Sequence, residues 1–308
     1  MSADSQYPGL IKAWLAFTRP KTWLLALSPV VAALALAWVD SGTFRPITAL
    51  FTLSIAVLMQ AITNMENDLG YAERNAETGN RRGLPRATTR GWISKPVARI
   101  AIRVAATLAL LNTAVLIWLG GWVFLLIGLA SLAAAYCYMG GPKPIAYTPF
   151  GEIMVLVFFG LTAVCGTYYL QTDAITTNAL LLGVALGTIA TGVLAVNNFR
   201  DVEHDASIGR MTLPVTIGPK RFFTLFACMM TVPFIALVIM VALHPTLWPC
   251  LITCVCARNA AHIIHELQIR RHEELNAVMF DCVQFEFAYA ILFTISILAS
   301  SFGTSLLS

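Results

Sequence analysis

Long apolar runs separated by short polar segments dominate the chain. Runs that fit membrane-spanning helices lie at residues 23–39, 46–62, 100–119, 121–138, 153–170, 178–196, 222–243, 246–264 and 280–298. Each run is close to the roughly 20 apolar residues that an α-helix needs to cross a bilayer. None of them alternates polar and apolar residues in the way that an outer-membrane barrel strand does. The pattern therefore predicts an all-α, polytopic membrane protein with nine transmembrane helices.

The composition supports this interpretation. Of 308 residues, 58% are hydrophobic and 12% are charged, and the mean hydropathy is +0.74, which is far too apolar for an ordinary soluble domain. The formal net charge is +4, but the basic residues flank apolar runs instead of forming a patch on a soluble module, so nucleic acid is excluded as a partner. All seven cysteines lie in or beside apolar runs, which argues against a disulfide framework.

The distribution of positive charge predicts the orientation of the helices. Nearly all of the 20 lysines and arginines lie in the polar lead at residues 1–22 or around alternate connections between the runs, and Arg45 is the exception. By the positive-inside rule, the N-terminus and these connections are cytoplasmic and the C-terminus lies on the opposite side of an inner (cytoplasmic) membrane. Within the cytoplasmic lead, Leu10–Phe17 is predicted to form a short amphipathic helix at the membrane surface. We expect residues 1–308 to form one domain.

Two polar, acidic segments directly follow apolar runs. Asn64, Asn67 and Asp68 follow the run at 46–62, and the block at 197–205 follows the run at 178–196. Ionisable groups at membrane depth are costly and usually mark a substrate or ion pathway. The two segments also form a faint repeat, Asn-x-x-Asn-Asp answered by Asn-Asn-x-x-Asp, with an even number of helices between them. This repeat predicts a parallel duplication whose two acidic segments face each other across one central cavity, open to the cytoplasm and the bilayer.

The residue types in these segments indicate a particular chemistry. Clusters of aspartate and asparagine supply only oxygen ligands, which suit Mg²⁺ bound together with a substrate phosphate. Five cationic residues are candidates to clamp a diphosphate and stabilise a charged leaving group; they are Arg19, Lys21, Lys143, Arg200 and Arg210. The surrounding apolar helices are suited to hold a long hydrocarbon. Together these features indicate the transfer of an isoprenoid from its diphosphate.

The motifs resemble those of a known family. Asn64-x-x-Asn67-Asp68, the block from Asn197 to Asp205, Arg19-Pro20-Lys21-Thr22 and the nine predicted helices are similar to the UbiA superfamily of intramembrane aromatic prenyltransferases. The resemblance spans roughly residues 15–300. Within that superfamily the chain most resembles the branch that prenylates 1,4-dihydroxy-2-naphthoate. The segments that carry the second resemblance are Gly141–Thr148, Gly151-Glu152, Phe158-Phe159-Gly160, Gly83–Ala87 and Gly91–Ser94.

The resemblance implies roles for individual residues. It makes Asp68, Asp201 and Asp205 the magnesium carboxylates, and it implies that Tyr147 borders the aromatic acceptor or the allylic cation. The remaining expected contacts to metal or diphosphate are Asn64, Asn67, Asn197, Asn198, Arg200, Lys143, Arg19, Lys21, Arg86 and Arg210. The implied reaction joins a polyprenyl group to the naphthoate carbon that bears the carboxylate. Diphosphate and CO₂ leave, and demethylmenaquinol for menaquinone synthesis is formed.

One departure from the family pattern changes what the first segment is expected to do. The family's first motif usually continues as Asn-Asp-x-x-Asp-x-x-x-Asp, whereas this chain has Tyr71 and Asn75 at the positions of the later aspartates. Glu66 and Glu73 lie on a different helix face from Asp68 and Tyr71. Glu77, in the loop that follows the helix, is able to fold back toward the site. The departure leaves three expectations open: weaker metal binding, a single metal ion, or an altered substrate.

Other readings of the sequence are kept as alternatives. One alternative assigns a different acceptor: 4-hydroxybenzoate, homogentisate or an aromatic compound of a secondary pathway. A non-catalytic transporter or lipid-binding protein is a further alternative, since transporters also contain repeats and broken helices. Asp201 and Asp205 are alternatively interpreted as charges on a solvated surface. Asn64 and Asn67 are alternatively interpreted as residues that cap the end of a helix. His262 and His265 share a helix face, and interface packing is favoured there over metal binding.

Overall fold

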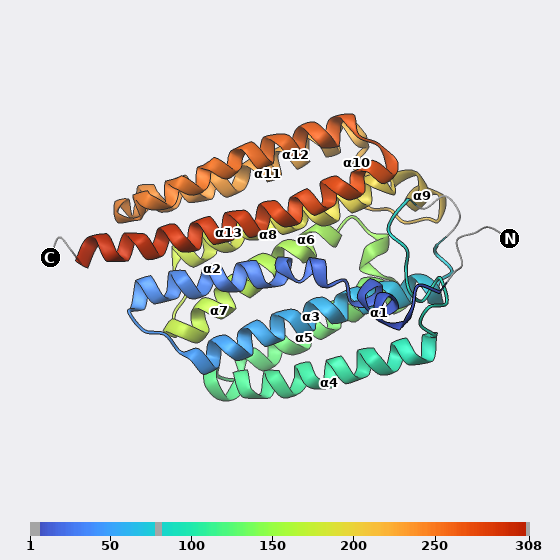
Figure 1. Cartoon of the computed structure of the whole chain (residues 1–308), viewed down its shortest axis with the longest axis horizontal. Coiled ribbons are helices and arrows are strands. Elements are labelled where there is room, and N and C mark those ends of the chain that lie inside the picture. Colours follow the sequence, from blue (N-terminus) through green and yellow to red (C-terminus); the bar gives the residue numbers. More distant parts are fainter. Residues whose placement is uncertain (1–6, 78–81, 306–308) are drawn as a thin grey trace.

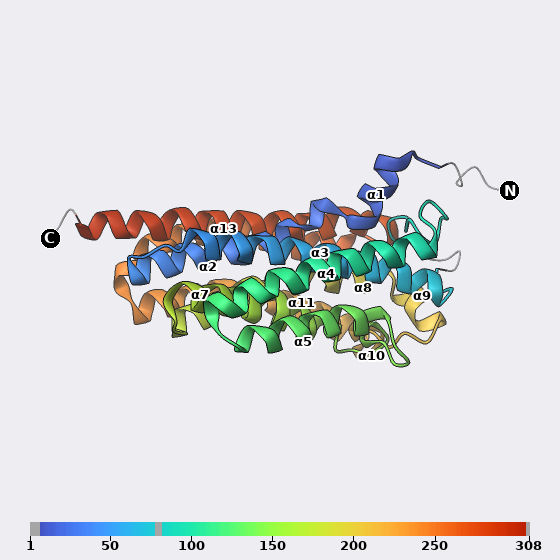
Figure 2. The ribbon, with the colours of Figure 1, turned by 90° about the horizontal axis from the view of Figure 1, so that it is seen from below.

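The computed structural model describes residues 7–77 and 82–305, and within these residues all regular elements are helical. The long helices lie side by side along the longest axis of the molecule (Figure 1). The short elements α1 and α9 lie near the end from which the chain starts, and the C-terminus lies at the opposite end (Figures 1 and 2). Residues 1–6, 78–81 and 306–308 lie outside the described residues. The all-α class predicted from the apolar runs is confirmed.

The α-helices are α1 (Leu10–Thr18), α2 (Leu24–Ser41), α3 (Pro46–Glu73), α4 (Lys95–Gly120), α5 (Val123–Met139), α6 (Gly151–Val155), α7 (Ala163–Thr172), α8 (Thr177–Arg200), α9 (Val202–Ser207), α10 (Leu213–Ile217), α11 (Pro219–Leu243), α12 (Ala257–Ile269) and α13 (Leu275–Ser305). A π-helical segment, η3 (Leu156–Thr162), joins α6 to α7. Tighter 3₁₀ turns form η1 (Pro20–Thr22), η2 (Ile145–Tyr147), η4 (Pro245–Cys256) and η5 (His272–Glu274).

The predicted spans fall on these helices. Within the described residues, eight helical stretches are long and apolar enough to cross a membrane, and α5 is a shorter apolar helix of 17 residues. The chain is therefore an integral membrane protein by the length and composition of its helices, while the count of nine spans stays a prediction because of α5. The predicted span at 246–264 begins as the 3₁₀ segment η4, which contains Pro249; proline lacks the N–H that an α-helix needs there.

The amphipathic helix predicted at Leu10–Phe17 is confirmed as α1. Its Ala13 and Phe17 are fully buried in a cluster with Met65 and Leu69 of α3. Its Leu10 and Ile11 are 65% and 76% exposed. An apolar face left uncovered by protein is what a helix at a membrane surface presents to lipid.

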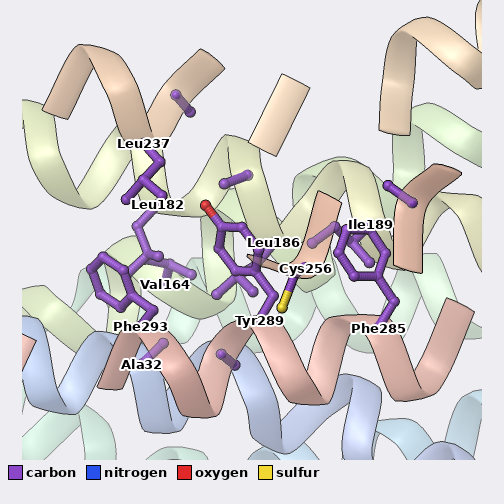
Figure 3. Close-up of a cluster of buried hydrophobic side chains, with 14 of the residues drawn as sticks. Ala32, Val164, Leu182, Leu186, Ile189, Leu237, Cys256, Phe285, Tyr289 and Phe293 are labelled. Carbon is purple, nitrogen blue, oxygen red and sulfur yellow. The ribbon is translucent and has the colours of Figure 1, made fainter. Parts of the chain in front are cut away.

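The main hydrophobic core forms where α13 packs against α8. Phe285, Tyr289 and Phe293 of α13 point toward the α8 side chains Leu186 and Leu182 (Figure 3). The hydroxyl of Tyr289 donates a hydrogen bond of 2.8 Å to the carbonyl oxygen of Pro233 inside α11. This bond gives the phenol a partner in a region without water, where an unsatisfied polar group costs several kcal/mol. The core thus fixes α8, the helix that leads into the second polar segment.

A close approach between backbones holds the π-helical segment η3 against α8. A Cβ added at Gly160 would lie 2.4 Å from the carbonyl oxygen of Gly183 and 2.5 Å from the Cα of Gly187. Both neighbours are backbone atoms, which have little freedom to move away. The glycines therefore set the distance between α8 and η3, whose Phe158 and Phe159 line the cavity described below.

Replacing Gly160 with alanine is expected to destabilise the protein by about 1–3 kcal/mol, the usual cost of overpacking a tight core. Gly166→Ala is the matched control, because a Cβ there would meet only Phe124 at an ordinary 3.8 Å. Thermal unfolding of the two purified variants in the same detergent is the measurement. Equal unfolding temperatures would contradict the importance of this contact.

Candidate active site

A large cavity runs between the helices of the first half of the chain and α8. Its volume is about 690 Å³. Apolar side chains form most of its walls, among them Leu116 and Phe124 in one part and Phe158 and Phe159 in another. A cavity of this kind accepts an extended hydrocarbon, since an apolar chain gains free energy for each methylene group that leaves water.

The polar end of the cavity is cationic. Of the described residues that line it, the charged ones are Arg19, Lys21 and Arg86, and all three are positive. The amide side chains of Gln60, Asn64, Asn67 and Asn197 line the cavity as well. Positive groups at the edge of an apolar cavity favour a ligand with an anionic head and an apolar tail, because charges attract strongly where water is scarce.

Asn64 of α3 holds the turn that carries two of these cations. Its Nδ2 donates hydrogen bonds of 3.0 Å to the carbonyl oxygen of Thr18 and to Oγ1 of Thr22. Between these two threonines, Arg19 has a left-handed backbone with φ of 49°, a conformation that costs free energy for a residue other than glycine. Asn64 thus stabilises a strained turn that directs Arg19 and Lys21 to the cavity.

Asp68 of α3 holds the loop that carries the third cation. The backbone N–H groups of Ala87 and Thr88 each donate a 2.9 Å hydrogen bond to its carboxylate, and the Thr88 hydroxyl donates a third. The Asp68 side chain is fully buried and does not line the cavity. Asp68 was predicted to bind a metal ion. In this structure its carboxylate instead holds the loop at Ala87 and Thr88, and so positions Arg86, which directly precedes them.

Tyr71, at the position of a family aspartate, lies between two arginines. The guanidinium of Arg86 lies 3.5 Å from the centre of the Tyr71 ring, which is a close cation–π contact. Arg210 donates a hydrogen bond to the Tyr71 hydroxyl from the opposite motif. The two polar segments predicted to face each other are therefore in contact, through Tyr71 and Arg210 and also through His204, whose Nε2 lies 3.0 Å from the carbonyl oxygen of Ala76.

The two aspartates of the second motif are buried and balanced by arginine. Arg200 bonds both carboxylate oxygens of Asp201, at 3.1 and 2.5 Å, and Arg210 bonds Asp205 at 2.8 Å. Asp201 is 3% exposed and Asp205 is fully buried. The alternative reading of these aspartates as charges on a solvated surface is thus wrong. Arg200 also bonds the side-chain oxygens of Asn197 and Asn276, so these polar side chains form one network.

The second motif contains oxygen donors of the kind that a hard divalent cation prefers. Asp201 and Asp205 supply buried carboxylates, and Asn198 Oδ1 is a buried oxygen without a hydrogen-bond partner in the described structure. An all-oxygen set of this kind suits Mg²⁺. Among the described residues, no three or more His, Cys, Asp or Glu side chains gather in an arrangement that could hold a metal ion. A cation here would therefore draw its remaining ligands from amide oxygens, water or a substrate phosphate.

Sequence reasoning assigned no role to Glu152, which lies beside this motif. Glu152 is 4% exposed and accepts a 2.9 Å hydrogen bond from Nδ2 of Asn198. Its second oxygen, Oε2, has no partner among the described residues. An acidic residue immediately before the apolar run at 153–170 was the signal that could have identified it.

Two other predicted site residues lie on the loop after α5. Lys143 is exposed and does not line the cavity, so the structure does not bring its ammonium group to the polar end. Tyr147 lies 5.7 Å from the guanidinium groups of both Arg74 and Arg210, and burial raises the pKa of its phenol. Arg74 was not singled out from the sequence; it donates hydrogen bonds to the carbonyl oxygens of Met139 and Gly141 and so fixes this loop.

The remaining acidic and histidine candidates have other contacts. Glu73 forms an exposed ion pair with Arg99 at 2.6 Å, which agrees with the separate helix face expected for it. Glu77 does return from the loop, and its Oε2 lies 4.0 Å from Nε of Arg86. His262 and His265 are exposed on α12, where Nδ1 of His262 lies 4.0 Å from Glu266.

Comparison with known proteins agrees with this architecture. The model of the UbiA prenyltransferase family matches residues 26–298. A 1,4-dihydroxy-2-naphthoate octaprenyltransferase of Escherichia coli K12 is 35% identical over 77% of this chain and 79% of its own length. The enzyme of the same name from Haemophilus influenzae is 34% identical over 68% of this chain and 71% of its own.

A solved structure has the same fold. It is a UbiA homolog from Archaeoglobus fulgidus bound to DMAPP and Mg²⁺, which superposes with a TM-score of 0.68 at 15% sequence identity and covers 93% of this chain and 99% of its own. The family match extends over most of the chain, and the two octaprenyltransferases are similar over most of their length. The chain therefore belongs to the UbiA prenyltransferase family.

Proposed function

We propose that this protein transfers a polyprenyl group from polyprenyl diphosphate to 1,4-dihydroxy-2-naphthoate, with loss of diphosphate and CO₂, and so makes demethylmenaquinol for menaquinone synthesis. The observation that carries the proposal is the apolar cavity whose only charged lining residues, in the described structure, are cations. The acceptor is inferred from the names of relatives at 34–35% identity.

The residues around the polar end have distinct tasks in this reaction. Arg19, Lys21 and Arg86 bind the diphosphate and stabilise the negative charge that develops as the bond from carbon to oxygen breaks. Asn64 and Asn67 contribute amide groups at the same end. Phe158, Phe159 and the other apolar lining residues hold the prenyl chain and exclude water from the allylic cation. Tyr147 stays a neutral phenol at neutral pH, since its pKa is raised, but it does not line the cavity in the described structure.

The bond changes balance without a further reactant. The electron-rich acceptor carbon that bears the carboxylate attacks the allylic carbon, and diphosphate leaves with the electron pair of the broken bond. The bond to the carboxylate then breaks, CO₂ departs, and its electron pair restores the aromatic ring. Diphosphate and CO₂ are the two leaving groups, so no oxidant or reductant is consumed.

Asp201 and Asp205 are the residues that we propose to hold Mg²⁺, with Asn197 and Asn198 in support. The solved homologs bound to Mg²⁺ and to Cd²⁺ support the use of a divalent ion by this fold. When bound, Mg²⁺ would neutralise charge on the departing diphosphate. Arg200 and Arg210 balance the two carboxylates until then, because a buried carboxylate without a counter-charge is strongly unfavourable.

We further propose that residues 1–308 act as one domain in an inner (cytoplasmic) membrane. The basic residues of the lead and of alternate connections support a cytoplasmic N-terminus and active site, with the C-terminus on the opposite side. In Figure 1, α1 and α9 lie near one end of the bundle and the C-terminal end of α13 lies at the other, as this orientation requires.

The decisive experiment incubates the purified protein in detergent with Mg²⁺, a polyprenyl diphosphate and either 1,4-dihydroxy-2-naphthoate or 4-hydroxybenzoate. We expect mass spectrometry to detect a prenylated, decarboxylated naphthoquinol together with released diphosphate, and no prenylated benzoate. Omission of Mg²⁺ is expected to stop the reaction. As a control, a sample treated with EDTA and then resupplied with Mg²⁺ should recover its activity, which would show that the loss of activity is reversible.

Each other outcome assigns a different function. Product with the benzoate alone would retain the chemistry and overturn the naphthoate acceptor. No diphosphate release with either acceptor, from protein that elutes as a single folded species, would favour the non-catalytic lipid-binding or transport alternative. A carrier would bind the lipid and release it unchanged.

A further inference from the structure

Asp68, Glu73 and Glu77, three carboxylates of α3 and the loop after it, already have partners in the described structure, and none of them lines the cavity. Asp68 accepts hydrogen bonds from two backbone N–H groups and one hydroxyl of residues 87 and 88. Glu73 is paired with Arg99 at the outer surface, and Glu77 approaches Arg86. Tyr71, one helical turn after Asp68, presents a phenol that is already in contact with two arginines.

The same helix positions cations instead. Asn64 secures the turn of Arg19 and Lys21, Asp68 secures the loop that follows Arg86, and Tyr71 stacks under the Arg86 guanidinium at 3.5 Å. Arg86 is 1% exposed yet lines the cavity, so its charge acts in a region of low dielectric. A guanidinium has several N–H donors in a flat arrangement, which match two oxygens of a phosphate at once.

From this geometry we infer that the α3 side of the site binds the diphosphate directly through Arg86, Arg19 and Lys21, without a metal ion, and that the protein uses a single divalent ion, at Asp201 and Asp205. This inference rests on the proposed function for the identity of the ligand. It goes further by stating that diphosphate affinity and metal binding belong to different polar segments and are separable, since Arg86 lines the cavity whereas Asp201 and Asp205 lie buried outside its lining.

The first test measures the binding of inorganic diphosphate by calorimetry in EDTA. We expect measurable affinity in the absence of metal. Arg86→Met is expected to weaken this affinity by about 10-fold to 100-fold, which corresponds to the loss of charge-assisted hydrogen bonds. Arg86→Lys keeps the positive charge but lacks the several N–H donors of a guanidinium. Its diphosphate affinity is expected to lie between those of the unaltered protein and of Arg86→Met. Arg82→Met is the matched control, since Arg82 lies on the same loop, is exposed and does not line the cavity.

The second test counts metal ions. Mn²⁺ is titrated into the protein in the presence of a non-cleavable prenyl thiodiphosphate and followed by electron paramagnetic resonance, where we expect one ion per chain. Asp201→Asn is expected to remove this ion while metal-free diphosphate binding stays as tight as in the unaltered protein or becomes tighter. Two Mn²⁺ ions per chain, or no diphosphate binding in EDTA, would overturn the inference.

The tests also separate this inference from the proposed function. Turnover with the naphthoate combined with two bound Mn²⁺ ions would refute the inference and keep the function. Metal-free binding that depends on Arg86, in protein that prenylates neither acceptor, would keep the inference about the anion site and refute the function. Size-exclusion profiles of all variants establish that a lost affinity is not a loss of folding, and Arg86→Lys serves if Arg86→Met does not fold.

Discussion

Replacing Asp201 or Asp205 with alanine is expected to abolish prenyl transfer. Each carboxylate is at most 3% exposed, and we propose that the two together hold the divalent ion that neutralises the leaving diphosphate. Such an ion contributes several kcal/mol to stabilising the transition state, and each 1.36 kcal/mol is a factor of ten in rate. We therefore expect kcat/KM to fall by at least about a thousandfold in either variant, measured as diphosphate release.

The alanine variants also test the arginines that balance these carboxylates. Asp205→Ala leaves Arg210 buried without its 2.8 Å partner, and breaking a buried ion pair by removing one side costs about 3–5 kcal/mol. Asp201→Asn and Asp205→Asn keep the side-chain shape and retain one oxygen for a guanidinium. If the asparagine variants are folded and inactive, the loss belongs to metal binding and not to the fold.

Glu73→Ala is the control that should leave the enzyme active. Glu73 pairs with Arg99 outside the bundle, where both side chains are more than 40% exposed, and such pairs contribute about 0–1 kcal/mol. We expect turnover to change less than about fivefold, which is the upper end of that energy expressed as a rate. An active Asp201→Ala enzyme would refute the metal assignment, and an inactive Glu73→Ala enzyme would show that acidic residues of α3 matter for a reason other than metal binding.

The architecture could be predicted from the sequence because it depends on local patterns. Runs of about twenty apolar residues specify membrane helices, and Leu10–Phe17 forms the expected short helix, α1. The ends of the helices were harder to predict. α3 continues to Glu73 and α8 to Arg200, past the apolar runs, because buried polar side chains near these ends find partners on other segments, as Asp68 does at Ala87 and Asn198 does at Glu152.

The contacts within the site could not be predicted, since they join residues distant in the sequence. The direction of Asp68 depends on backbone groups 19 and 20 residues further along the chain, and Tyr71 meets Arg210 across 139 residues. Spacing along one helix predicts which side chains share a face, but it says nothing of what another segment brings to that face. The departure at Tyr71 was visible in the sequence, whereas its two arginine partners were not.

Asp68→Ala provides the sharpest test of what α3 does, because two roles for this residue predict different results without metal. As a positioning residue, Asp68 satisfies two buried backbone N–H groups and a hydroxyl. Its loss should therefore destabilise the protein by about 3–5 kcal/mol, or lower the unfolding temperature by about 10 °C, even in EDTA. As a metal ligand, its loss should leave stability in EDTA unchanged and reduce only the binding of Mn²⁺.

We expect the first result, together with a loss of metal-free diphosphate binding as Arg86 leaves its position. Thr88→Ala is the matched partial change, since it removes only the hydroxyl that donates to Asp68 and keeps both backbone donors. Its expected cost is about 0.5–1.5 kcal/mol, the net value of one hydrogen bond. A folded Asp68→Ala protein that keeps its stability in EDTA and binds diphosphate normally would return Asp68 to the metal site, because a carboxylate that neither supports the loop nor orients Arg86 has no other role on this wall.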